Sequence, residues 1–101
     1  MTDEALFEWD PRKAEANIAK HGISFEEAAR SFADPFALLE LDRIVDGELR
    51  WKTTGLVGVT TIIVVAHTIR DNEDREIIRI ISARRAERHE RKRYENEARP
   101  I

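Results

Sequence analysis

The sequence contains no cysteine, and only four glycines and three prolines occur among its 101 residues. Without cysteine the chain has no disulfide scaffold, zinc ribbon or thiol nucleophile, which fits a reducing compartment. With so few glycines, no phosphate-binding loop, G-x-S-x-G motif or nucleotide fingerprint is found. The longest apolar run, residues 62–66, is far shorter than the roughly 20 residues of a membrane span. The acidic first ten residues lack a signal-peptide core, so we expect a soluble cytoplasmic protein.

Composition and charge describe one globular domain with an uneven charge distribution. Hydrophobic residues make up 42% and charged residues 37% of the chain, and a single domain over residues 1–101 fits this length. The net charge is −3, yet residues 79–93 contain seven Lys or Arg and two Glu. Such a basic segment fits a polyanion or an acidic protein partner, and a merely solvated helix face is equally open.

The N-terminal third predicts a short strand and a helix. The strand is expected at Leu6–Trp9, and Asp10 then caps a helix that starts with Pro11 and stops at Gly22. The inner face of this helix is expected to carry Ala14, Asn17 and Ile18.

A capping box predicts the second helix. Ser24 is followed three residues later by Glu27, and Asp34-Pro35 stops the helix after about Phe32. The residues expected to be buried are Phe25, Ala28, Ala29 and Phe32.

Beyond the helices the hydrophobic period changes to two, which indicates strands. Asp46-Gly47 is a strong hairpin signal, whereas Gly58 alone marks a second turn. Residues 69–74 read as a polar loop, and residues 83–97 as a helix with few apolar positions. The strands are expected at Phe36–Arg43, Glu48–Val57, Thr60–Thr68 and Arg75–Ser82.

This order of elements predicts an α+β domain with a mainly antiparallel sheet, two N-terminal helices and a C-terminal helix. The two helices should cover one face of the sheet and leave the other open for function.

Three strand residues are candidates for chemistry on such an open face. If Arg50, His67 and Arg79 face the same way, two guanidiniums and an imidazole would bind a phosphodiester and move a proton on it. Structural readings are equally open: cross-strand ion pairing for Arg50, a satisfied strand-end histidine at position 67, and pairing of Arg79 with Glu76 or a helix carboxylate. His21 fits either a site or a helix C-terminus.

A metal centre has little support. The three histidines are far apart in the sequence, no two are spaced by four residues, and no dense carboxylate cluster suggests a two-metal site. We expect neither a metal nor another cofactor.

Several colinear motifs between about residues 6 and 95 carry a resemblance to a known family. The most specific is residues 79–86, Arg-Ile-Ile-Ser-Ala-Arg-Arg-Ala. The others are Phe7-Glu8-Trp9-Asp10, Lys13, Asn17, Lys20-His21-Gly22, Phe25-Glu26-Glu27-Ala28, Phe32-Ala33-Asp34-Pro35, Arg50-Trp51, Thr54-Gly55, His67-Thr68, Glu90-Arg91 and Tyr94. The chain resembles the BrnT family of type II toxins, small bacterial ribonucleases related in fold to RelE.

The resemblance implies a RelE-like domain that cleaves RNA and arrests translation. It also implies a cognate BrnA antitoxin with a ribbon-helix-helix domain. The pair would repress its own operon, with operator DNA bound mainly through the antitoxin. A non-catalytic binding module, such as a degraded toxin acting as corepressor, is the competing hypothesis.

For a metal-independent endoribonuclease, we expect the 2′-hydroxyl to attack phosphorus and give a 2′,3′-cyclic phosphate. Arg50 and Arg79 would bind the phosphate, and His67 would transfer the proton, with His21 in reserve. Tyr94 would stack on a base or anchor the last helix. The residues expected to hold the RNA backbone are Lys20, Lys52, Arg84, Arg85 and Arg88.

Overall fold

The structure, a computed structural model, describes residues 5–97. It contains one sheet of five strands in the order β1-β5-β4-β3-β2, together with three α-helices and a short 3-10 helix. The elements along the chain are β1 (Leu6–Glu8), α1 (Pro11–His21), α2 (Phe25–Arg30), η1 (Ser31–Ala33), β2 (Leu38–Val45), β3 (Glu48–Val57), β4 (Thr61–Asn72), β5 (Arg75–Arg85) and α3 (Arg88–Glu97).

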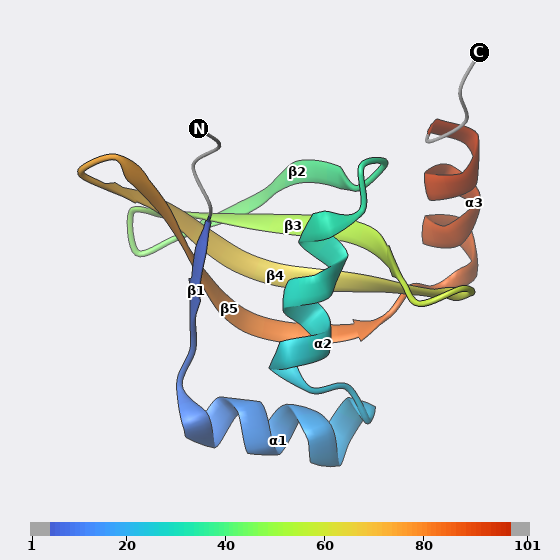
Figure 1. Ribbon diagram of the computed structural model, residues 1–101, viewed down its shortest axis with the longest axis horizontal. Coiled ribbons are helices and arrows are strands. Elements are labelled where there is room, and N and C mark those ends of the chain that lie inside the picture. The colour runs from blue at the N-terminus through green and yellow to red at the C-terminus, as the bar shows by residue number, and fades with distance from the viewer. Residues whose placement is uncertain (1–4, 98–101) are drawn as a thin grey trace.

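The α+β class is confirmed, but the sheet is mixed. Strands β2 to β5 form an antiparallel meander, whereas β1 pairs in parallel with β5 at one edge. Parallel strands need a long connection, and here the chain passes through both helices and the other strands before β5 reaches β1 (Figure 1). The first and last strands of the chain therefore lie side by side.

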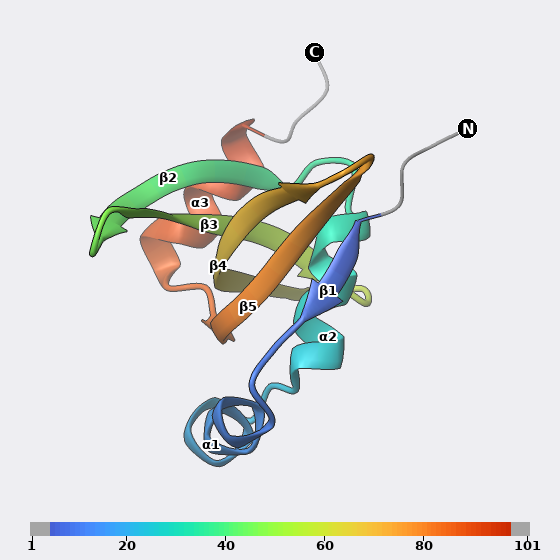
Figure 2. The same ribbon diagram turned by 90° about the vertical axis from the view of Figure 1, so that its left-hand side faces the viewer.

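Helices α1 and α2 lie on one side of the sheet, which we call the helical side, and α3 lies on the other (Figure 2). The core is on the helical side, where Phe25 and Ala28 of α2 pack against Ile63, Val65 and Ile80. Gly55 of β3 permits this close packing, because a Cβ there would lie 2.6 Å from the backbone oxygen of Ser31.

The two N-terminal helices begin where the sequence predicts. Asp10 and Ser24 cap them, and the capping box between Ser24 and Glu27 is present. Ile18 differs from the prediction, because it is half exposed, while Asn17 is the buried residue of α1. The α1 helix turns this side inward because the Asn17 amide binds the backbone at Ala83 of β5.

The hairpins around β4 and β5 correct two predictions. Residues 69–74 are not a polar loop: the ladder runs on to the pair Asn72–Arg75, and only Glu73 and Asp74 form the turn. Similarly, residues 83–85 are not helical, because Ala83, Arg84 and Arg85 still pair with β4. Backbone pairing at both ends of the hairpin outweighs the polar and helix-favouring local composition.

The last helix covers part of the sheet face that was expected to be open. Glu90 of α3 binds Arg84 of β5 through two hydrogen bonds, and Arg93 pairs with Glu40 of β2. The buried Tyr94 donates its hydroxyl to Asp34. In Figure 1, α3 lies at the end of the sheet away from the β2–β3 and β4–β5 turns, so the rest of that face is uncovered. Within residues 5–97 no helix is long and apolar enough to cross a membrane.

Candidate functional site

The uncovered part of the sheet opposite the helical side carries several basic residues, and we call four of them the cationic face. Side chains alternate along a strand, and Gly55 and Thr53 of β3 face the helical side, where they contact Ser31 and His67. The even-numbered positions of β3 therefore point the other way. The members of the cationic face are Arg50, Lys52, Arg70 and Arg79.

Arg50 is held in an unusual environment for a cation. Its side chain is 27% exposed, and Glu48 Oε1 lies 3.4 Å from Nε. That contact lacks hydrogen-bond geometry, so Nε is a buried side-chain nitrogen without a hydrogen bond in the described part of the chain. The Glu48 carboxylate offsets the charge on this side of the guanidinium, so the terminal nitrogens are the part of Arg50 that can meet an anion.

Arg70 and Arg79 converge on a single carboxylate from β1. Arg70 donates two hydrogen bonds of 3.0 Å to Glu8, and Arg79 donates one of 3.1 Å to Glu8 Oε2. The two bonds from Arg70, and then the one from Arg79, lower the pKa of Glu8 below its usual value of 4.5. The group carries two positive charges and one negative charge, and it retains donors for another anion.

The register places these groups in one row across the sheet. Arg43 pairs with Arg50, Thr68 pairs with Arg79, and Arg79 pairs with Glu8. Trp51 pairs with His67, and the two strands are antiparallel. The residue before Trp51, Arg50, therefore lies beside the residue after His67, Thr68. Neighbouring strands lie about 4.8 Å apart, so Arg50 and Arg79 flank Thr68 across about 10 Å. Two guanidiniums at this spacing can bind one phosphodiester from two sides.

His67 lies on the helical side, so the prediction that it faces the same way as Arg50 and Arg79 is wrong. It is fully buried, its Nε2 is 2.8 Å from the Thr53 hydroxyl, and its ring meets Phe32 edge to face. Burial lowers the pKa of His67 to about 4, so the imidazole is neutral at pH 7. The sheet itself separates this imidazole from the cationic face.

The other predicted residues are dispersed. Lys20 and His21 end α1 on the helical side, and Arg85 lines a hollow beside α2 together with Arg30. Arg84 faces α3, where Glu90 occupies it. Lys52 alone joins Arg50 and Arg79.

Two predicted residues belong to α3. Arg88 is exposed in its first turn, and the buried Tyr94 is tied to Asp34, which favours the anchoring role over base stacking.

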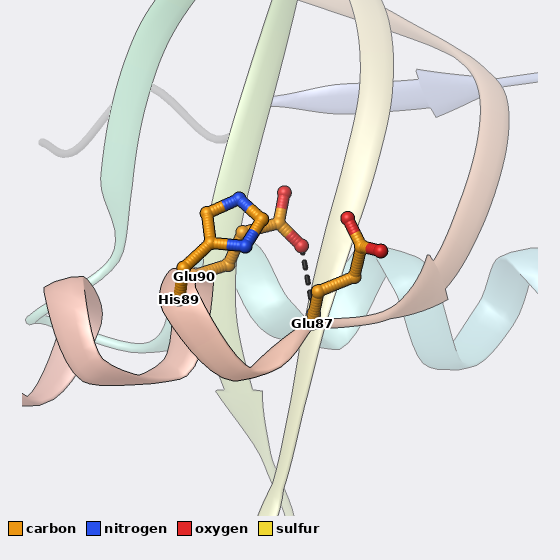
Figure 3. A group of neighbouring side chains, drawn as sticks. All are labelled: Glu87, His89 and Glu90. Atoms are coloured by element: carbon orange, nitrogen blue, oxygen red, sulfur yellow. Dashed lines mark hydrogen bonds between the residues drawn. The ribbon is translucent and has the colours of Figure 1, made fainter.

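One group of potential metal ligands exists among residues 5–97, at the start of α3 (Figure 3). Atoms of Glu87, His89 and Glu90 lie within 4.8 Å of one another. The Glu90 carboxylate, however, already accepts hydrogen bonds from Arg84 and from the backbone nitrogen of Glu87. This arrangement fixes the first turn of α3 and commits the Glu90 carboxylate to structure.

The sequence does not predict a role for Arg70 or for Glu8, which both contribute to this site. Arg70 lies in the segment that reads as a polar loop, and Glu8 enters only through the motif at residues 7–10. Side chains alternate along β1, so Glu8 points to the face opposite the partly buried Phe7. This alternation is the sequence signal that indicates the position of Glu8.

Comparisons with known proteins bear on this site. A family model described as the ribonuclease toxin BrnT of type II toxin-antitoxin systems matches residues 9–90. The 1.1 Å crystal structure of the Brucella abortus ribonuclease toxin BrnT is similar, with a TM-score of 0.57 and 24% identity over 86% of this chain and 100% of that chain. At this identity the likeness shows a shared fold. No curated protein matches.

Proposed function

Because the chain belongs to the BrnT family of ribonuclease toxins of type II toxin-antitoxin systems, we propose that it cleaves RNA on the cationic face and thereby arrests translation. The observation that carries this proposal is the register, which places Arg50 and Arg79 on either side of Thr68 on the same face of the sheet, with side chains that are 27% and 44% exposed. A phosphate would bind between the two guanidiniums through their terminal nitrogens. A BrnA-like ribbon-helix-helix antitoxin would neutralise the toxin and bring the pair to operator DNA.

The scissile phosphate would lie over Thr68, between the guanidiniums of Arg50 and Arg79. Arg79 has one hydrogen bond to Glu8, so its other N–H groups are available to an anion. Positive charges fixed on a sheet stabilise the extra negative charge of a pentavalent phosphate without reorganising during the reaction.

Glu8 is the group that we assign to proton transfer, in place of His67. Its carboxylate lies beside Arg79 on the cationic face, where it is ionised at neutral pH and can accept the 2′-hydroxyl proton. The hydrogen bonds from Arg70 and Arg79 that lower its pKa make it a weaker base than an isolated carboxylate. The 2′-oxygen then bonds to phosphorus, and the bond from phosphorus to the 5′-oxygen breaks. Lys52 stabilises the departing oxygen, and water supplies its proton. The products are a 2′,3′-cyclic phosphate and a 5′-hydroxyl, and the residues named require no metal.

Cleavage of a 5′-labelled RNA by purified protein in EDTA tests this function. Wild type should cleave, and both Arg50→Ala and Arg79→Ala should lower the rate by at least about 100-fold, which is the usual cost of losing a transition-state contact. Arg30→Ala is the matched control, because Arg30 is exposed on α2, and it should cleave like wild type.

The same assay separates the enzyme from a binding module. If wild type leaves the RNA intact both alone and with translating ribosomes, the ribonuclease proposal fails and the corepressor hypothesis gains support. If Arg50→Ala and Arg79→Ala cleave like Arg30→Ala, the activity exists but does not lie on the cationic face.

A further inference from the structure

The β2–β3 hairpin exposes a row of large apolar side chains on the helical side of the sheet. Eight large hydrophobic residues are exposed within residues 5–97, and four of them belong to this hairpin. These four form what we call the apolar strip: Leu39, Leu41, Ile44 and Leu49, which are 54%, 52%, 62% and 45% exposed. Single exposed apolar residues are ordinary, but contiguous ones mark binding surfaces.

Strand pairing shows that the strip is continuous. Leu39 pairs with Thr53, Leu41 with Trp51, and Ile44 with Leu49. Thr53 faces the helical side, where it contacts His67. Residues paired across an antiparallel ladder share a face, and so do alternate residues of one strand. All four strip residues therefore lie on the helical side. Figure 1 shows that the β2–β3 turn extends beyond the part of the sheet that α2 covers.

A pocket adjoins the strip and shares Leu39 with it. It has a volume of about 230 Å³, and its apolar wall is made by Phe32, Leu39, Ile69 and Ile78. A hollow of this size accepts one large apolar side chain, the arrangement typical of an anchor residue in a protein interface.

The rim of this pocket is acidic. Glu76 lines it, is exposed, and forms no ion pair within residues 5–97. Asp71 pairs with Glu76 across the β4–β5 ladder, so both carboxylates lie on the same face. Glu73 and Asp74 follow in the turn. These carboxylates repel RNA and attract a basic group.

We propose that the apolar strip and its adjoining pocket are the docking surface of the antitoxin, which would present apolar side chains flanked by lysine or arginine. The inference rests on the proposed function for the identity of the partner. Charge complementarity favours this occupant over a second copy of the chain, because a symmetric pairing brings the same surface to both sides and adds no basic group to match Glu76. The docking surface and the cationic face are thus opposite sides of one sheet.

Binding of the antitoxin encoded in the same operon tests the surface. Calorimetry measures the affinity of the toxin for this antitoxin. Every toxin variant also carries Arg79→Ala, which alters the cationic face and leaves the apolar strip intact. Leu41→Glu should raise the dissociation constant by at least about 100-fold, and Glu76→Lys by about 10-fold. Leu41→Thr should also weaken binding. Because threonine is favoured in strands, this variant should fold even if Leu41→Glu does not.

Val59→Glu is the matched control. Val59 is 90% exposed in the turn between β3 and β4. The substitution therefore introduces the same charge at an exposed apolar residue outside the strip, and antitoxin binding should be unchanged. Equal affinity for Leu41→Glu, Leu41→Thr and wild type would overturn the proposal. So would light scattering that shows wild type alone as a dimer and Leu41→Glu as a monomer. If the wild-type protein does not cleave RNA, alone or with translating ribosomes, while binding still depends on the strip, only the ribonuclease function is refuted.

Discussion

Replacing Asn17 by alanine should destabilise the protein more than an alanine at any other position of α1. Its side-chain nitrogen donates to the backbone oxygens of Ile23 and Ala83, at 2.9 and 2.8 Å, and its oxygen accepts from the Ala83 nitrogen at 3.0 Å. Strand β1 pairs with β5 only as far as Arg79. The Asn17 amide therefore takes the place of a neighbouring strand beside Ala83. Its hydrogen bonds connect α1 both to the turn that follows this helix and to β5.

The magnitude follows from the groups left unpaired. Each buried polar group without a partner costs about 1–3 kcal/mol, and three backbone groups lose theirs in Asn17→Ala. Because water can reach part of the space, we expect a loss of about 3–5 kcal/mol. A domain of this size has a total unfolding free energy of about 5–14 kcal/mol, so the variant should be close to unfolding.

Urea unfolding followed by tryptophan fluorescence measures this loss. Trp9 packs edge to face on Phe25 of the core, so its emission reports on the region around α1. Ile18→Ala is the control, because Ile18 is the next residue on the helix but is 50% exposed, and it should cost less than about 1 kcal/mol. A loss below about 1 kcal/mol for Asn17→Ala would refute the assignment of Asn17 as a buried bridge.

Two further predictions concern pH. Burial lowers the pKa of His67 to about 4, so its imidazole should remain neutral at pH 6 in an NMR titration. Because an unfolded histidine titrates near pH 6.5, stability should fall as the pH drops from 6.5 to 4, and His67→Gln should remove that part of the fall. Hydrogen bonds from Arg84 lower the pKa of Glu90 to about 2, so the stabilisation is complete above about pH 4.5 and is lost as the pH falls towards 2. The stability of Glu90→Gln should not show this loss, whereas Glu26→Gln, at an exposed position of α2, should retain it.

Local chemistry explains which parts of the fold could be predicted from the sequence. The Asp46-Gly47 turn has φ values of 49° and 80°, the left-handed conformation that a two-residue hairpin turn requires and that these residues tolerate. The helix caps at Asp10 and Ser24 depend on equally local contacts. Residues 69–74 and 83–85 depend on pairing with a distant strand, so their polar or helix-favouring composition was misleading.

The candidate site shows the same division. Alternation along β4 correctly grouped His67 with Ile63 and Val65, but it gave no information on which face was the core. The register between strands decides that question, and a pattern within one strand does not contain it. The contact of Glu8 with Arg70 joins residues 62 positions apart. A pattern within one strand cannot reveal such a contact, so the sequence predicts roles for Arg50 and Arg79 but not for Arg70 and Glu8.

The most direct test of the central claim is to find which face of the sheet binds RNA. Titrating the ¹⁵N-labelled wild-type protein with a 2′-O-methyl RNA, which lacks the attacking hydroxyl, allows binding to be followed without cleavage. Binding on the cationic face predicts amide shifts centred on Arg50, Thr68 and Arg79, and little change at Lys20 and His21. Shifts centred on Lys20, His21 and Arg85, with none at Arg50 or Arg79, would contradict it.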